Sequence, residues 1–362
     1  MTKALCVAVH GGAGNHSRTN EKAAKHSLRQ ACIRALASAQ QMDNGSALSI
    51  VENAISVLED DPTFNAGYGS NLTLDGGVEC DASIMDGRSG DFGSVGAVSG
   101  VKNPIHVARY VLEYSRIPDK LGRLPPMTVV SDGAQDLVIR AGFDVQSVHP
   151  DELVTPRAKG DWTKWKELLV AASESGNVTN DAQMPGLDDL QDTVGAVAWV
   201  DGDGVAAGVS SGGLLLKHSG RIGEAAVFGA GCWAQGNMAC SVSGAGEHII
   251  RASLARSLGE PFMMSEDIDP HDVLYHTLVE KFWRPCRSRG VSSPNAGLIL
   301  ITKAESISTV RLWCAFTTPT MAIAYASSTD PVPKALILRR PNLTTGLSDT
   351  PNIFVTAITL KI

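Results

Sequence analysis

Apolar and polar residues along the first part of the chain follow patterns typical of short strands and amphipathic helices. Apolar residues spaced three or four apart indicate helices, and short β-branched runs bounded by glycine or asparagine indicate strands. Ser46 is placed to cap one helix, and Pro104 to begin another after Asn103. The pattern predicts strands at residues 5–9, 80–85, 94–99 and 127–130 and helices at residues 24–39, 46–58, 104–114 and 134–140.

The periodic pattern stops between about residues 144 and 191. This stretch is polar, carries prolines at positions 150, 156 and 185, and predicts one helix at most, over residues 162–172. Because long segments without regular structure are uncommon inside a compact fold, we expect an exposed linker here.

Regular structure resumes at Thr193. Two apolar strands surround the turn residues 201–204, which predicts a hairpin. Strands and helices occur in runs, so we predict an α/β fold in which sheets stack face to face and helices cover them. The second half is predicted to hold strands at residues 193–200, 205–210, 296–302, 310–316 and 321–326 and helices at residues 246–258 and 270–282.

Composition narrows the class of protein. A net charge of −7 and 43% hydrophobic residues describe an ordinary globular chain, and the acidic balance disfavours a general nucleic-acid binder. No apolar run approaches the roughly 20 residues that span a bilayer, and residues 1–9 lack the features of a secretory signal. The seven scattered cysteines form no CxxC pair, as expected for reduced thiols. We therefore expect a cytoplasmic or nuclear protein that binds neither nucleic acid nor membrane.

Motifs for metals and cofactors do not occur in the sequence. It lacks HExxH, a cysteine and histidine cluster and a complete calcium loop. Residues 12–14 follow a strand, but neither the full dinucleotide fingerprint nor a phosphate-binding GxxxxGK[ST] motif is present. We predict no metal and no cofactor.

The pair Asp192-Thr193 carries a chemical signal, because it joins the polar segment to a strand. A break between these residues would leave Thr193 with both a hydroxyl and a free α-amine. An α-amine titrates at about 7.7–8.0, so it can act as a general base near neutral pH. Threonine with its own terminal amine is a recognised nucleophile. Taken alone, Thr193 is more simply a β-branched residue that opens a strand.

Residues that follow Thr193 support the chemical interpretation. The hairpin register brings Ser211 back near Thr193, and Arg221 stands among glycines. Residues 243–247 then offer a hydroxyl and exposed N–H groups, as an oxyanion hole requires. Together these residues form an ordered series around one nucleophile.

With further motifs, this series resembles the asparaginase and glycosylasparaginase family of N-terminal-nucleophile threonine hydrolases. Within that family it is most similar to the threonine aspartase (taspase) branch. The motifs that carry the resemblance lie at residues 10–14, 65–71, 79–87, 99–104, 192–197, 210–221 and 243–248.

The resemblance implies a four-layer αββα sandwich made as a proenzyme. The chain would cut itself between Asp192 and Thr193, which gives an α subunit of residues 1–192 and a β subunit of residues 193–362 in one compact domain. We also expect a homodimer, of proenzymes or of processed units.

The resemblance also implies roles for individual residues. Thr193 would be the nucleophile, with its own α-amine as base, and Ser211 would contact that amine. Arg221 would hold a substrate carboxylate, and Glu224 stands where asparaginases carry an aspartate that pairs with the α-ammonium of their substrate. The remaining assignments are Ser243 and Gly244 to the oxyanion hole, and Gly12 and Asn65 to the lining of the site.

Three functions follow as hypotheses. The first is an endopeptidase that cleaves protein substrates after aspartate, supported by residues 80–83, the linker and the full-length similarity. The alternative is an L-asparaginase or isoaspartyl peptidase acting on small β-aspartyl substrates. Glu224 favours this alternative, because an internal aspartate has no α-ammonium to pair. A binding module that uses the glycine-rich loops for an anion is third.

The basic residues of the linker are too dispersed for a dense nuclear signal: Arg157, Lys159, Lys164 and Lys166.

Overall fold

Two β-sheets form the centre of the molecule. The computed structural model describes residues 3–41, 45–142, 147–175, 193–265, 268–303, 309–341 and 351–362. Across the larger sheet the strands run in the order β12 (Lys334–Arg339), β11 (Thr320–Ser327), β1 (Leu5–Gly14), β5 (Val194–Val200), β6 (Gly204–Ser211), β2 (Cys80–Asp86), β3 (Phe92–Val98) and β4 (Thr128–Val130). The smaller sheet has the order β13 (Phe354–Lys361), β10 (Thr309–Phe316), β9 (Ala296–Lys303), β8 (Met238–Gly244) and β7 (Cys232–Gln235).

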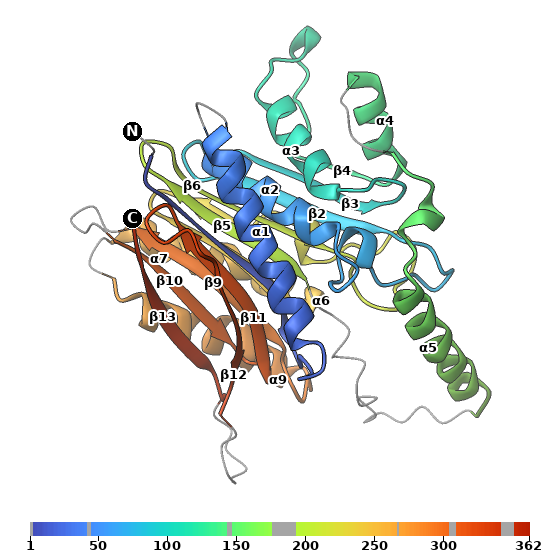
Figure 1. Ribbon diagram of the computed structural model, residues 1–362. Coiled ribbons are helices and arrows are strands. Elements are labelled where there is room, and N and C mark those ends of the chain that lie inside the picture. Colours follow the sequence, from blue (N-terminus) through green and yellow to red (C-terminus); the bar gives the residue numbers. More distant parts are fainter. Residues whose placement is uncertain are drawn as a thin grey trace.

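Helices cover the outer faces of both sheets. Figure 1 shows α1 (Glu21–Gln41), α2 (Ala47–Glu59) and α3 (Pro104–Ser115) on one side of the larger sheet, and the smaller sheet, with β9, β10 and β13 in orange to red, on its other side. The second helical layer packs on the smaller sheet. Its helices are α6 (Gly246–Ala252), α7 (Leu254–Met264), α8 (Pro270–His276) and α9 (Arg284–Ser288), with a π-helical segment, Thr277–Trp283, between the last two. This is the αββα sandwich that the resemblance implied.

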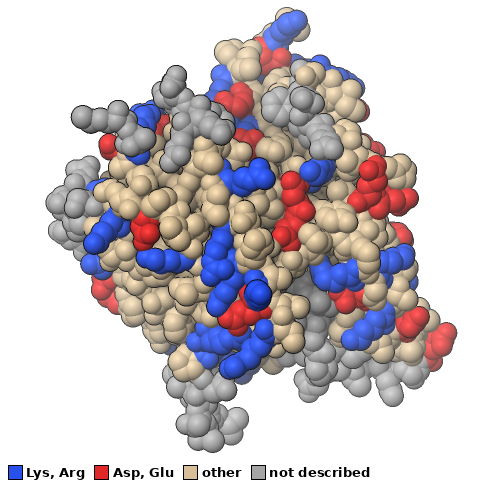
Figure 2. Space-filling view, viewed as in Figure 1, with Lys and Arg blue, Asp and Glu red and all other residues tan. Residues whose placement is uncertain are grey.

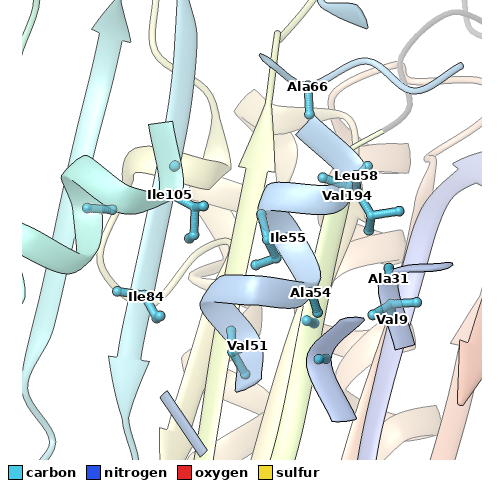
Figure 3. Packing of buried hydrophobic residues seen from close by; sticks show 14 of the residues in the cluster. Val9, Ala31, Val51, Ala54, Ile55, Leu58, Ala66, Ile84, Ile105 and Val194 are labelled. Carbon is cyan, nitrogen blue, oxygen red and sulfur yellow. The ribbon is translucent and has the colours of Figure 1, made fainter. Parts of the chain in front are cut away.

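Strand alternation explains why the larger sheet is buried on both faces. In β1, Val7 and Val9 pack in the cluster under the helices, whereas Cys6 and Ala8 pack in the cluster between the sheets. Figure 3 shows Val51, Ala54, Ile55 and Leu58 of α2 packed with residues from the sheet and from α1 and α3. A layered fold of this kind predicts near-continuous apolar strands, as the sequence has.

Most of the predicted elements are confirmed, several with longer bounds. Ser46 caps α2 by accepting a hydrogen bond from the backbone N–H of Ser49, at 3.1 Å. The predicted hairpin is β5–β6, and α4 (Asp132–Ala141) ends at Gly142 in the left-handed region, with φ of 62°.

Other elements differ from prediction. β1 does not end at Val9 but continues to Gly14 across a register shift between His10 and Ala13. The helix predicted over residues 246–258 is two helices that meet at Ser253, whose φ is 43°. The edge strands β12 and β13 and the short β7 were not predicted, because short strands at a sheet edge carry a weak periodic signal.

The segment expected as an exposed linker holds a long helix. After η3 (Pro150–Leu153), α5 runs over Pro156–Ser175 and extends beyond the predicted residues 162–172. Its first half is tied to the body, since Arg157 donates to the carbonyl of Gly69 at 2.6 Å and Trp162 to that of Thr73 at 2.8 Å. The rest of the expected linker, with Asp192, lies outside the described residues.

The molecular surface is mixed in charge. On the face seen in Figure 2, basic and acidic side chains are interspersed, without an extended stripe of one sign. None of the helices in the described ranges combines the length and apolar character needed to cross a bilayer.

Close packing of α3 on β3 depends on Gly93. A Cβ at this position would lie 2.3 Å from the carbonyl oxygen of Ala108 and 2.4 Å from the amide nitrogen of Leu112. Gly93→Ala should therefore cost about 1–3 kcal/mol of stability through overpacking. The measurement is the urea midpoint of unfolding.

The matched control is Gly160→Ala in α5, where nothing lies within 4 Å of the added Cβ. That change should leave the midpoint unchanged or raise it, by up to about 1 kcal/mol. Equal midpoints for Gly93→Ala and the wild type would contradict the packing described here.

Candidate active site

Thr193 and Ser211 meet at the end of the β5–β6 hairpin. Val194 pairs with Ser210, so the residues next to them lie side by side, and the two hydroxyl oxygens are 3.1 Å apart. By alternation both side chains project toward the smaller sheet, since Val194 packs under the helices and Val197 between the sheets. The contact that the hairpin register predicted is confirmed.

Glu224 completes the contacts of the Thr193 hydroxyl. It begins a short 3₁₀ turn, Glu224–Ala226, and its Oε1 accepts a hydrogen bond from Thr193 Oγ1 at 3.0 Å. Thr193 is 2% exposed and Glu224 is 3% exposed. Burial raises the pKa of Glu224 to about 7, although the nearby charge of Arg221 opposes this shift. Sequence reasoning placed Glu224 toward a substrate and missed its contact with Thr193, which the length of the glutamate side chain allows.

Arg221 is held by a carboxylate from α6. Its Nε and Nη2 donate to the two carboxylate oxygens of Glu247 at 2.8 and 2.7 Å, a bidentate pair. The remaining nitrogen, Nη1, lies toward the backbone of Gly213 and Gly223, where added Cβ atoms would be 3.0 and 2.9 Å from it. Glu247 therefore engages one edge of the Arg221 guanidinium, and Nη1 faces the glycine-rich loop, which is formed by residues 212–223.

Two charged residues that sequence reasoning did not assign to the site support this loop. Asp81, fully buried on β2, accepts the N–H of Gly223 at 2.7 Å and that of Ala97 at 2.8 Å. Lys217 is 4% exposed and donates to the carbonyl of Glu79 at 2.6 Å. The signal that could have found them is the presence of charged residues inside apolar or glycine-rich motifs, since burial of an unpaired charge is costly.

Asn65 holds the loop after Ser211. Its amide nitrogen donates to the carbonyl of Gly213 at 2.8 Å, and its side-chain oxygen accepts the N–H of Asn71 at 2.8 Å. Its backbone carbonyl accepts the N–H of Gly212. These contacts make Asn65 a positioning residue for the turn that follows Ser211, with its amide engaged inside the protein.

Ser243 and Gly244 end β8, next to β1. The Ser243 hydroxyl accepts the N–H of Ala13 at 3.1 Å, just after Gly12, whose φ is 100°. Gly244 has a φ of 144°, and a Cβ there would lie 2.3 Å from the carbonyl oxygen of Asn295. The position therefore requires glycine. The structure brings these residues to the inter-sheet side, and their role toward a reacting oxygen stays a prediction.

The hydroxyl next to Ser211 points to the opposite layer. Ser210 donates to Glu59 Oε1 at 2.6 Å, and the same oxygen accepts the N–H of Ile105 at 3.0 Å. Glu59 is fully buried at the end of α2, and burial raises its pKa to about 7. Glu59 therefore anchors the end of β6 from the helical side without touching Thr193.

A buried histidine lies close to the start of β5, near Thr193. Nε2 of His10 lies 2.9 Å from the hydroxyl of Ser241, and burial lowers the pKa of His10 to about 3. His10 pairs with Gly195, where an added Cβ would collide with both His10 and Ser241. His10 is thus neutral near pH 7 and is a packing element between the sheets.

Other parts of the described chain offer no competing centre. Within it, no group of three or more histidine, cysteine or acidic side chains is arranged to hold a metal ion. A surface cavity of about 510 Å³ lies between β11, β12 and β13, and none of the residues named above lines it.

Comparison with known proteins identifies the family. The sequence profile of the family described as "Asparaginase" matches residues 3–292. A plant-type L-asparaginase of Thermococcus kodakarensis is 36% identical over 286 residues, which cover 77% of this chain and 86% of that protein. The chain therefore belongs to the asparaginase family of N-terminal-nucleophile hydrolases.

Two further relatives carry related names. The isoaspartyl peptidase/L-asparaginase of Mus musculus is 36% identical over 255 residues, which cover 70% of this chain and 71% of that protein. The isoaspartyl peptidase of Escherichia coli is 36% identical over 263 residues, which cover 70% and 75%. These names overturn the expectation of an aspartate-specific endopeptidase of the threonine aspartase branch. They agree with the alternative, an asparaginase or isoaspartyl peptidase.

The raised pKa of Glu59 predicts how stability varies with pH. A carboxyl whose pKa is higher in the folded than in the unfolded protein contributes stability below its ordinary pKa of 4.5, and this contribution is lost as pH rises through about 7. Glu59→Gln keeps an acceptor for Ser210 but cannot ionise. Between pH 5 and pH 8 the variant should therefore gain stability relative to the wild type, by roughly 3 kcal/mol at most.

Thermal midpoints of both proteins at several pH values test this prediction. Glu247→Gln, which changes a half-exposed carboxylate, is the control and should not reproduce the gain. A constant difference between wild type and Glu59→Gln across the range would show that Glu59 keeps an ordinary pKa.

Proposed function

We propose that this protein hydrolyses the side-chain amide of asparagine and the β-aspartyl bond of isoaspartyl dipeptides. The observation that carries the proposal is a pair of opposite charges, Arg221 and Glu224, beside the buried hydroxyl of Thr193. A free amino acid or an N-terminal β-aspartyl residue has both an α-carboxylate and an α-ammonium, so it matches this pair. The names of the relatives support the same substrate class.

Arg221 would hold the α-carboxylate. Glu247 engages Nε and Nη2, which leaves the donors of Nη1 on the side of Gly213 and Gly223. A guanidinium has five donors in a fixed plane, so it can bind Glu247 and a substrate carboxylate together. Glu247 would thereby orient Arg221 for the substrate.

Glu224 would hold the α-ammonium. Its carboxylate is buried, so an arriving cation would interact with it in a medium of low dielectric constant, where attraction between charges is strong. An internal aspartate in a protein has no α-ammonium and would leave this carboxylate without a counter-ion. Glu224 therefore favours small substrates.

Catalysis would begin with self-cleavage between Asp192 and Thr193, which frees the α-amine of Thr193. The amine would then take the proton from Thr193 Oγ1 as that oxygen attacks the substrate's side-chain carbonyl. The same proton passes to the departing ammonia or amine, and an aspartyl ester remains on Thr193. Water, activated by the amine, hydrolyses this ester and releases aspartate.

Ser211, Ser243 and Gly244 would assist these steps. Ser211, already 3.1 Å from Thr193 Oγ1, would contact the amine, as the resemblance implies. Ser243 and Gly244 would stabilise the oxyanion of the tetrahedral intermediate, a contribution that is often large in acyl transfer. We also propose that the chain divides into subunits 1–192 and 193–362, that it forms a homodimer, and that it is cytoplasmic or nuclear.

Self-cleavage is tested by the mass of the purified protein. The wild type should give two fragments with a new N-terminus at Thr193, because the hydroxyl can attack the preceding carbonyl. Thr193→Ala removes the hydroxyl and should remain a single chain of 38.1 kDa. Thr193→Ser retains a hydroxyl and should still cleave. Cleavage of the alanine variant at the same bond would exclude Thr193 as the nucleophile.

Substrate class is tested by incubating the processed enzyme with asparagine, a β-aspartyl dipeptide and a peptide with an internal aspartate. The first two should be hydrolysed and the third should not. Arg221→Lys keeps the charge but loses the planar guanidinium, so kcat/KM for both small substrates should fall about tenfold or more.

Arg284→Lys is the matched control. Arg284 pairs with Glu280 at an exposed site on the outer helices, so its replacement should leave turnover unchanged. Cleavage of the internal-aspartate peptide without turnover of asparagine would refute the proposed function.

A further inference from the structure

Self-cleavage poses a chemical problem that turnover does not. Before the chain is cut, the nitrogen of Thr193 belongs to the peptide bond with Asp192, and an amide nitrogen does not accept a proton at ordinary pH. The α-amine that serves as base in turnover therefore does not yet exist. Another group has to take the proton from Thr193 Oγ1.

Contacts of the Thr193 hydroxyl point to one side chain. Among the described residues, two side chains lie within hydrogen-bond distance of Oγ1, those of Ser211 and Glu224. Ser211 carries a hydroxyl, a poor base, and its oxygen already accepts the N–H of Gly213 at 3.0 Å. Glu224 is ionisable, and in its carboxylate form it only accepts hydrogen bonds, so it can take the proton of Thr193 Oγ1.

We propose that Glu224 is the general base, and then the general acid, of the self-cleavage reaction. This role rests on the self-processing included in the proposed function and adds a catalytic group to it. The geometry meets the requirement for such a group, because Oε1 is 3.0 Å from the oxygen whose proton it removes.

The proton transfers balance as follows. Glu224 takes the proton from Thr193 Oγ1, and a bond forms between that oxygen and the carbonyl carbon of Asp192. The bond from that carbon to the nitrogen of Thr193 breaks, and Glu224 returns the proton to the leaving nitrogen, which becomes an amine. The product is an ester between Asp192 and the Thr193 side chain. Water then attacks the ester carbonyl, and the products are the Asp192 carboxylate, the Thr193 hydroxyl and a protonated Thr193 amine.

The surroundings suit a carboxyl that changes its protonation near neutral pH. Burial of Glu224 raises its pKa to about 7, and the negative charge of Asp81 acts in the same direction. The positive charge of Arg221 opposes the shift. The elements packed around Glu224 carry several charged or titratable groups: Cys80, Asp81 and Asp86 on β2, Lys217, His218 and Arg221 in the loop before it, and Glu247, His248 and Arg251 on α6.

Glu224 would act at two stages separated in time. In the uncut chain its carboxylate removes the proton of Thr193. After cleavage the new amine of Thr193 takes over that task, and the same carboxylate becomes available to the ammonium of the substrate. One buried acid thus serves maturation first and recognition afterwards.

The test measures self-cleavage of the full chain without any substrate. The chain is made by cell-free translation with a short radioactive pulse, and the loss of the 38.1 kDa precursor is followed on gels at pH 5.5–8.5. The wild-type rate should rise with pH and level off above about pH 7, as the carboxyl ionises. Glu224→Gln should cleave about 10²–10⁴ times more slowly, with a rate that no longer rises through this range.

Two variants separate loss of the base from loss of the fold. Glu224→Asp retains an ionisable group one methylene shorter, so it should cleave at an intermediate rate that still rises with pH. Glu59→Gln removes another fully buried carboxyl whose pKa is about 7 but which contacts Ser210 rather than Thr193, so it should keep the wild-type profile. Thermal midpoints of the purified precursors show whether each variant is folded.

The outcomes are distinct. Cleavage of Glu224→Gln at the wild-type rate, or a pH rise abolished by Glu59→Gln instead, would overturn the role of Glu224 and leave the proposed function intact. A wild-type chain that stays uncut would remove both this role and the self-processing step. If Glu224→Gln does not fold, a rate for Glu224→Asp that is independent of pH would overturn the role, and one that rises with pH would support it.

Discussion

Burial of the β5–β6 hairpin on both faces is the constraint on which the site depends. The hairpin lies inside the larger sheet, with α2 on one face and the smaller sheet on the other. A polar side chain at its end is buried, and an unsatisfied buried hydroxyl costs about 1–3 kcal/mol. Strand alternation therefore sends each hydroxyl to a carboxylate in its own layer. Thr193 meets Glu224 between the sheets, and Ser210 meets Glu59 under the helices.

The same burial organises the charges around Thr193. Asp81 accepts hydrogen bonds from two backbone N–H groups and lies near Arg221, which in turn pairs with Glu247. The glycine-rich loop is what allows this, because at Gly213 and Gly223 a Cβ would lie 3.0 Å or less from the guanidinium. Charges held in this way are fixed in direction before a substrate arrives, which is the condition under which electrostatic catalysis is effective.

The proposed substrate class rests on one acidic side chain more than on overall similarity. The expectation of protein substrates gave weight to full-length resemblance and treated Glu224 as an exception. Its buried carboxylate beside Arg221 is better matched by a molecule that brings its own ammonium, and the relatives named L-asparaginase and isoaspartyl peptidase agree with this. Overall similarity reports the fold, whereas the proposal on substrates rests on the charges beside Thr193.

The sequence by itself determined the layered fold, the hairpin and the pairing of Thr193 with Ser211, because these depend on local periodicity and on a two-strand register. It also marked Arg221 as a candidate, since a cation among glycines is unusual. Only the tertiary structure decided the full extent of the helix over residues 156–175, the edge strands, and the contacts of Asp81, Glu59 and Glu247. Above all, it decided that Glu224 reaches the hydroxyl of Thr193. These contacts join segments far apart in the chain, and their energies come from burial and from the approach of charges, neither of which a local pattern of residues contains.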